Sequence, residues 1–255
     1  MIAPLLLLAA QAALPAATAS RSTDETRFNH CVELATSVPA SAEREAGDWQ
    51  FQGGGFLARQ CLGLAYATEL RWTGAAAEFE AAARAAEIAR DPRAANYWAQ
   101  AGNAWLASGD APHARAALDA ALASATLVGL PRGEAELDRA RALVAAGDTK
   151  AARNDIDRAL VDAVDDPLAW LLSATLARRM NDLPRAQHDI AEALRRAGDD
   201  ASALLEAGNI AALASDEARA RSAWSQAAKL RPDSDAGRAA AAALRQFDPP
   251  PAAAR

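Results

Sequence analysis

The chain has 255 residues, of which 24% are charged, and it carries a formal net charge of −6 at pH 7. About half of the residues are hydrophobic but only 5% are aromatic, so alanine and leucine supply most of the apolar content. This composition favours helices, and no stretch shows the alternation typical of a strand. The acidic balance argues against a nucleic-acid-binding protein, which needs a basic face to displace counterions.

The first 19 residues predict a secretory signal peptide. They contain no charged side chain, carry an apolar run at Leu5–Leu8, and end in the small-x-small pattern Ala17-Thr18-Ala19. Cleavage would place the mature chain in the periplasm or outside the cell. The alternative is an uncleaved N-terminal membrane anchor, but two prolines and a glutamine interrupt the roughly 20 apolar residues that a spanning helix needs. No second long apolar segment follows, so we expect no integral membrane segment in the mature chain.

Residues 24–52 predict one helix pair, and the glycine triplet at residues 53–55 ends it. Apolar residues recur there at helical spacings, at Phe28, Cys31 and Leu34 and then at Ala42, Ala46 and Trp49. Cys31 and Cys61 would both lie on early inner helices, and an oxidising compartment allows thiols to pair. A Cys31–Cys61 disulfide is therefore possible; the alternative is two buried thiols that act as small apolar residues.

Downstream, a small residue is followed twelve positions later by an alanine five times. The pairs are Gly63 and Ala75, Gly102 and Ala114, Ala140 and Ala152, Ala174 and Ala186, and Gly208 and Ala220. Successive steps are 39, 38, 34 and 34 in both series. Self-similarity at this period predicts helical units that cannot bury their apolar faces alone and therefore stack into a solenoid.

These units resemble the tetratricopeptide repeat, whose pattern is W-x2-L-G-x2-Y followed by A-x3-F-x2-A. The unit from Phe56 has Leu62-Gly63-x2-Tyr66 and Ala75-x3-Phe79-x2-Ala82, whereas the unit from Gly133 departs from the pattern at Glu136 and Arg139. The resemblance implies an all-α fold, a right-handed superhelical α-solenoid of helix-turn-helix repeats. The repeats are then expected at residues 56–94, 95–132, 133–166, 167–200 and 201–234, with a capping helix at 235–247 and a disordered tail at 248–255.

In this family the first helices of the units line a concave groove that binds peptides. Carrying over the groove positions implies Gln60, Leu64, Asn96, Asn103, Arg141, Leu171, Thr175, Arg178, Arg179, Leu205 and Asn209. An asparagine in the groove can hydrogen-bond a peptide backbone through both its donor and its acceptor. The arginines would favour an acidic segment. The alternative for each residue is a solvated surface without a ligand.

No motif indicates catalysis, a cofactor or a metal. The chain has no His-x3-His, Cys-x2-Cys or Gly-x-Ser-x-Gly pattern, and the glycine triplet is not followed by Gly-Lys-Ser/Thr. We therefore predict no catalytic residue, cofactor or metal site.

The hypothesis that follows is a non-catalytic protein–protein interaction scaffold that binds a peptide or protein segment in the bacterial periplasm. The excess of arginine over lysine, with abundant alanine, is typical of a GC-rich bacterial genome. The alternative is an accessory or regulatory subunit of a cell-envelope enzyme or of a secretion or assembly machine, docking through its outer face or its N-terminal helices. An enzyme with a carboxylate-rich cleft is a third and more remote reading.

Overall fold

A computed structural model describes residues 16–247, which form thirteen α-helices and no strand. The helices are α1 (Ala16–Ser37), α2 (Pro39–Phe51), α3 (Gly55–Thr68), α4 (Trp72–Ile88), α5 (Ala94–Ser108), α6 (Ala111–Ala123), α7 (Leu130–Ala145), α8 (Thr149–Asp162), α9 (Pro167–Arg179), α10 (Leu183–Arg196), α11 (Ala201–Leu213), α12 (Glu217–Leu230) and α13 (Asp235–Phe247). Most of the predicted signal peptide and the predicted tail at 248–255 lie outside the described residues. None of the helices within the described range is long and apolar enough to span a bilayer.

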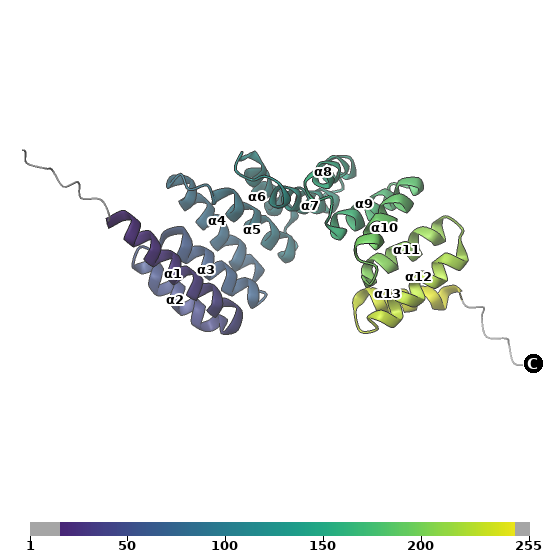
Figure 1. The fold of residues 1–255 in the computed structure, drawn as a ribbon, viewed down its shortest axis with the longest axis horizontal. Coiled ribbons are helices and arrows are strands. Elements are labelled where there is room, and N and C mark those ends of the chain that lie inside the picture. The colour runs from purple at the N-terminus through teal and green to yellow at the C-terminus, as the bar shows by residue number, and fades with distance from the viewer. Residues whose placement is uncertain (1–15, 248–255) are drawn as a thin grey trace, which may run out of the picture.

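The helices form antiparallel pairs that stack in chain order, so each helix packs mainly on its neighbours in the sequence. Figure 1 shows the result as an open arch, with α1 to α3 at one end, α7 and α8 at the crown, and α11 to α13 at the other end. The five pairs from α3/α4 to α11/α12 follow the order of the predicted repeats, but α7 begins at Leu130, before the predicted start of its repeat at residue 133. Helix α13 packs on α12 and α11 at the C-terminal end of the stack. The fold is an α-solenoid.

Close contact between the two helices of a pair explains the small residues that recur in the sequence. A Cβ added to Gly63 would lie 2.6 Å from the Phe79 ring, and one added to Gly102 or Gly208 would come within 3.0 Å of the side chain 16 residues later, Leu118 or Trp224. In the two remaining pairs alanine takes the glycine's place, and the residue 16 positions later is isoleucine, in the buried clusters around Ile156 and Ile190. A small residue thus makes room for a large one on the partner helix.

The turn inside each pair repeats as regularly as the contact does. One residue in each turn has a positive φ, and these are Leu70, Gly109, Gly147, Asn181 and Ser215. In the last four turns an aspartate follows and accepts a hydrogen bond from a backbone N–H of the next helix, as Asp110 does from His113. The residue with positive φ ends the first helix of the pair, and the aspartate that follows it caps the start of the second helix.

The N-terminal pair is tied to the first repeat by covalent and ionic contacts. A disulfide joins Cys31 of α1 to Cys61 of α3, with 6.0 Å between the Cα atoms. Arg71, which stands where the other turns have their capping aspartate, instead bonds Glu43 of α2 and covers the Tyr66 ring, with 4.0 Å from its guanidinium carbon to the ring centroid. These contacts fix α1 and α2 on the stack.

A concave groove lined by the first helices of the repeats

Three adjoining cavities follow the first helices of successive repeats. The amide cavity, of about 550 Å³, is lined from α1, α3, α5 and α7 and the loops beside them, and includes Gln60, Asn96, Gln100, Tyr97 and Glu134. The acidic cavity, of about 450 Å³, lies between α5, α7 and α9, with Glu134, Asp138 and Asp166 in its wall. The apolar cavity, of about 180 Å³, lies between α7, α8 and α9. Neighbouring cavities share wall residues, so together they form one groove.

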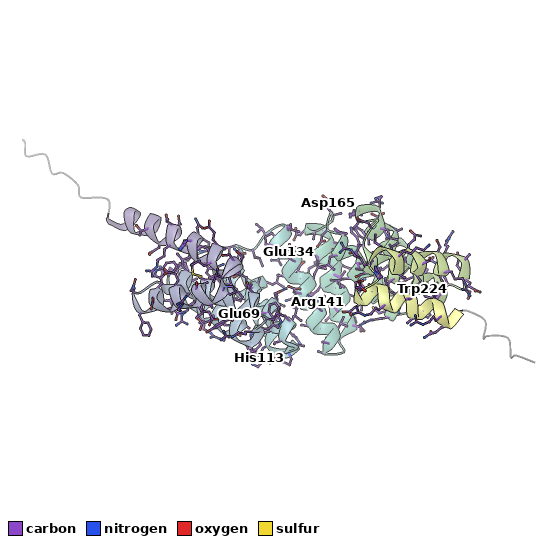
Figure 2. The ribbon with its side chains drawn as sticks, turned by 90° about the horizontal axis from the view of Figure 1, so that it is seen from below. Glu69, His113, Glu134, Arg141, Asp165 and Trp224 are labelled. Carbon is purple, nitrogen blue, oxygen red and sulfur yellow. A yellow bond between two sulfur atoms is a disulfide. The ribbon has the colours of Figure 1, made fainter. Side chains whose placement is uncertain are left out.

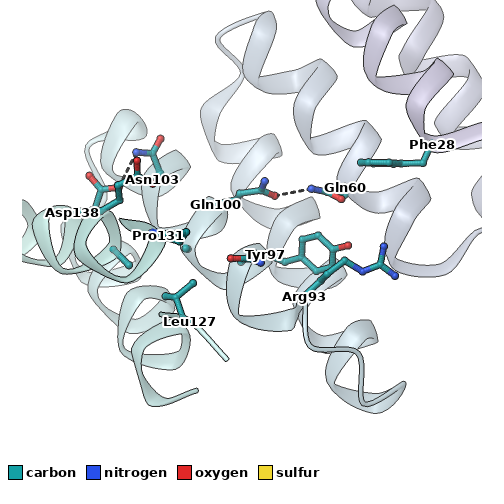
Figure 3. A pocket seen from close by; sticks show the side chains of 13 residues that line it. Phe28, Gln60, Arg93, Tyr97, Gln100, Asn103, Leu127, Pro131 and Asp138 are labelled. Atoms are coloured by element: carbon teal, nitrogen blue, oxygen red, sulfur yellow. Dashed lines mark hydrogen bonds between the residues drawn. The ribbon is translucent and has the colours of Figure 1, made fainter. Parts of the chain in front are cut away.

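The amide cavity offers hydrogen-bonding groups along α3 and α5. Gln60 donates to Gln100 across the two helices, with 3.3 Å between nitrogen and oxygen, and Asn96 is exposed beside them. Figure 3 shows the ring of Tyr97 in the middle of this wall, close to Arg93. The Tyr97 hydroxyl is buried and has no hydrogen-bond partner among the residues that the structure describes. Burial raises the pKa of Tyr97 to about 12, so the hydroxyl keeps its proton and remains a donor.

The acidic cavity brings together three carboxylates. Asp138 accepts a hydrogen bond from Asn103 of α5 at 2.9 Å and pairs with Arg141 of α7 at 2.9 Å. Asp166 caps α9 by accepting from the backbone N–H of Leu168. Glu134 forms no ion pair with any described residue. Its pKa is raised, first by partial burial and then by the charges of Asp166 and Asp138.

The apolar cavity continues the groove toward the other edge of the array. Its wall combines aliphatic side chains of α7, α8 and α9 with two arginines at the rim: Leu137, Ala140, Val144, Ile156, Leu172, Thr175, Leu176, Arg141 and Arg179. Arg141 and Arg179 are exposed, and Arg179 forms no ion pair within the described part of the chain. Glu134 and Arg141, both on α7, lie at the middle of the molecule in Figure 2.

The residues predicted to line a groove divide into two groups. Gln60, Asn96, Asn103, Arg141, Thr175 and Arg179 line the three cavities. Leu64, Leu171 and Leu205 instead pack against buried clusters between helices. Arg178 pairs with the buried carboxylate of Glu206 at 2.5 Å, and Asn209 donates to the same Glu206 and accepts from the Trp224 indole. These five are committed to packing or to intramolecular bonds.

The expectation that the arginines would favour an acidic segment stays a prediction, now limited to Arg179. Arg178 is neutralised by Glu206, and Arg141 is paired with Asp138. Sequence reasoning missed Glu134 and Asp138, although Glu134 occupies the second position of its repeat, which is a groove position in the family. The excess charge in the acidic cavity is negative.

A metal site requires several ligand side chains that lie close together. Across residues 16–247, no group of three or more His, Cys, Asp or Glu side chains is placed to hold a metal ion. The walls of the three cavities contain neither a histidine nor a cysteine.

Comparison with known proteins identifies the architecture. Neither a protein-family model nor a curated protein sequence matches the chain. Among solved structures, PilW, a widely conserved type IV pilus biogenesis factor, superposes with a TM-score of 0.70 over 85% of this chain and 97% of its own, at 18% identity. PilF of Pseudomonas aeruginosa gives 0.67 over 87% and 99%, also at 18% identity. The chain has the tetratricopeptide-repeat fold.

A third neighbour, YrrB, is a tetratricopeptide-repeat (TPR) protein with an unusual peptide-binding site. It superposes with a TM-score of 0.56 over 78% of this chain and 96% of its own, at 18% identity. The cavities of this chain are lined mainly from α3, α5, α7 and α9, the first helices of its repeats. At these identities the likeness is one of fold.

Proposed function

We propose that the chain is a non-catalytic scaffold that binds a peptide or protein segment in the concave groove, in the bacterial periplasm. The observation that carries this proposal is the continuous groove over α3, α5, α7 and α9, which combines amide donors and acceptors with an apolar cavity. Amides that pair with a peptide backbone, beside pockets for side chains, are the usual elements of peptide recognition. YrrB, a neighbour in fold, is a peptide-binding protein.

The periplasmic location is proposed on two grounds. The first 19 residues have the pattern of a signal peptide, and the disulfide between Cys31 and Cys61 is a bond that persists in oxidising compartments. Fractionation of expressing cells and N-terminal sequencing test this location directly. We expect periplasmic protein that begins at Ser20; an uncleaved chain in the cytoplasmic fraction would contradict it.

Groove binding is tested with an array of short peptides of varied sequence probed with the purified mature protein. We expect a subset of peptides to bind wild type and the control variant Arg115→Trp, whose site is on the exposed face of α6. The matched variant Thr175→Trp fills the groove and should lose those peptides. Equal binding by both variants, or no peptide bound by wild type, would overturn the proposal.

A second candidate function is that of an accessory or regulatory subunit of a cell-envelope assembly machine or enzyme, docked through the outer face or the N-terminal helices. Phe51, at the end of α2, is 96% exposed and is therefore free to contact a partner. PilF and PilW are neighbours in fold, and PilW is a pilus biogenesis factor. Co-purification from envelope extract that Phe51→Asp abolishes and Thr175→Trp leaves intact would favour this function over groove binding.

A further inference from the structure

The middle of the groove carries a charge pattern that identifies what kind of segment it would accept. The acidic and apolar cavities share Leu137, Arg141 and Leu172 in their walls, so they are immediate neighbours across α7 and α9. One has three carboxylates, and the other is lined mainly by aliphatic side chains. Two side chains of a bound segment that enter these two cavities therefore meet very different surroundings.

The charges of the acidic cavity do not cancel within the protein. Arg141 compensates Asp138, and the backbone N–H at the start of α9 partly compensates Asp166. Glu134 has no cationic partner among the described residues, and the neighbouring Asp138 and Asp166 act on it with the same sign. A cationic group in this cavity would relieve that repulsion.

The neighbouring amide cavity has one buried polar group without a partner. Tyr97, 1% exposed, lines that cavity, which shares Glu134 and Asp138 with the acidic cavity. Its hydroxyl has no hydrogen-bond partner among residues 16–247, and the side chain packs in the cluster of Ala82, Ala83 and Ala86. The protein covers this hydroxyl, so it takes no part in the contacts proposed below.

We propose that the groove over α5, α7 and α9 selects an extended segment in which a lysine or arginine lies two residues away from a large apolar residue, because side chains at alternate positions of an extended chain point to the same side. The cation lies among Glu134, Asp138 and Asp166, and the apolar side chain enters the cavity formed by Leu137, Val144, Ile156, Leu172 and Leu176. This inference rests on the proposed function, because it specifies the ligand of the same groove.

The test uses four families of synthetic peptides that share random flanking residues and differ at two central positions separated by one glycine. The families are named by these two positions: Lys-Leu, Glu-Leu, Lys-Ser and Ser-Leu. Binding to the mature protein is measured by array and then by calorimetry for the strongest member. We expect Lys-Leu peptides to bind most tightly, with Lys-Ser and Ser-Leu weaker and Glu-Leu weakest. Equal affinity for Lys-Leu and Glu-Leu peptides would overturn the charge assignment.

Variants at Glu134 test whether the charge of this carboxylate, rather than the fold of the groove, determines peptide affinity. Glu134→Gln should weaken Lys-Leu binding about fivefold, and Glu134→Lys should reverse the preference toward Glu-Leu. The matched control is Glu33→Gln on α1, which removes an equally exposed carboxylate without an ion pair and outside the three cavities. A loss at Glu134→Gln no larger than at Glu33→Gln would contradict the inference.

The outcomes also distinguish this inference from the function on which it rests. Binding of many peptides in the groove without a preference for Lys-Leu would leave the scaffold function standing and overturn the ligand class. If no peptide family binds, both fail. Similar affinity for Lys-Leu and Lys-Ser peptides would show that the apolar cavity does not contribute to recognition.

Discussion

Each turn between the paired helices of a repeat passes through one residue in the left-handed region, but the residue itself varies. Gly109 and Gly147 adopt φ values of 84° and 83°, and Leu70 and Ser215 adopt 59° and 60° at the same place in their turns. An L-residue with a Cβ pays a steric cost of about 1–2 kcal/mol in this conformation, and glycine does not. The turn geometry is therefore imposed by the stacking of the helices rather than by the local residue.

Leu70→Gly should stabilise the protein. Leu70 is 69% exposed, so little packing is lost, and relief of the left-handed strain exceeds the entropy that glycine loses by about 0.5–1 kcal/mol. Thermal or urea unfolding measures the change. The control is Ala116→Gly, also exposed but in the middle of α6, which should destabilise by about 1 kcal/mol. A loss of stability in both variants would contradict this account of the turn.

Gly102→Ala and Gly47→Ala should change stability in opposite directions although the substitution is the same. A Cβ at Gly102 would meet Leu118 closer than 3.0 Å, whereas nothing lies within 4 Å of a Cβ at Gly47 of α2. We expect Gly47→Ala to gain up to about 1 kcal/mol from helix propensity. Gly102→Ala should lose about 1–3 kcal/mol through overpacking. Unfolding midpoints test the pair, and a shared sign would show that the helix contact is not tight.

At the scale of elements, α7 is exceptional because ions replace apolar residues where it packs on α8. Glu136 is 1% exposed and lies 3.5 Å from Arg132 and 3.4 Å from Arg158. Arg139 forms a two-nitrogen pair with Asp155 of α8 and also reaches Asp119 of α6. The two residues that break the repeat pattern in the sequence thus join three consecutive helices through buried charge.

Glu136→Gln should alter how stability depends on pH. Burial, the largest influence, raises the pKa of Glu136 above its usual 4.5, against the opposing effect of Arg132 and Arg158. The folded state therefore binds this proton more tightly than the unfolded state, so the contribution to stability is complete below pH 4.5 and is lost as pH rises through the folded pKa. Glutamine cannot ionise and avoids that loss.

We expect the stability of Glu136→Gln relative to wild type to increase from about pH 4.5 toward neutral pH, as measured by urea unfolding at several pH values. Glu33→Gln, an exposed carboxylate without an ion pair, serves as the control and should show no such trend. A variant that loses most stability at neutral pH would mean that the ion pairs outweigh the burial of the charge.

The parts of the molecule that could be predicted from the sequence are those set by contacts within one repeat. The helix pairs follow from Gly63, Gly102 and Gly208, because the residue that needs the space lies only 16 positions later. The groove depends on contacts between repeats. Asn103 meets Asp138, 35 positions away, and Arg178 meets Glu206, 28 away. Which groove side chains remain available to a ligand is decided only when neighbouring repeats stack.

At the scale of the whole molecule, stability should be distributed along the arch because each repeat contacts mainly its neighbours. The groove section over α5, α7 and α9 lies at the centre of the array, whereas α13 closes the C-terminal end. The buried Ala240 of α13 packs into the cluster of Leu204, Trp224 and Ala227, with Leu244 at its edge. The helix covers an apolar surface that has no further repeat to cover it.

Removal of residues 235–255 should therefore unfold or loosen α11 and α12 without affecting peptide binding in the groove. The loss of apolar burial is expected to cost on the order of 3 kcal/mol locally. Hydrogen exchange should accelerate in α11 and α12 and remain unchanged in α5 and α7, and the exposed surface should promote self-association in sedimentation experiments. A control chain lacking only residues 248–255 should behave as wild type. Because α13 is remote from the three cavities, groove peptides should bind the truncated chain with unchanged affinity. A uniform rise in hydrogen exchange across all helices would contradict this account, since it would show that the array unfolds as one cooperative unit.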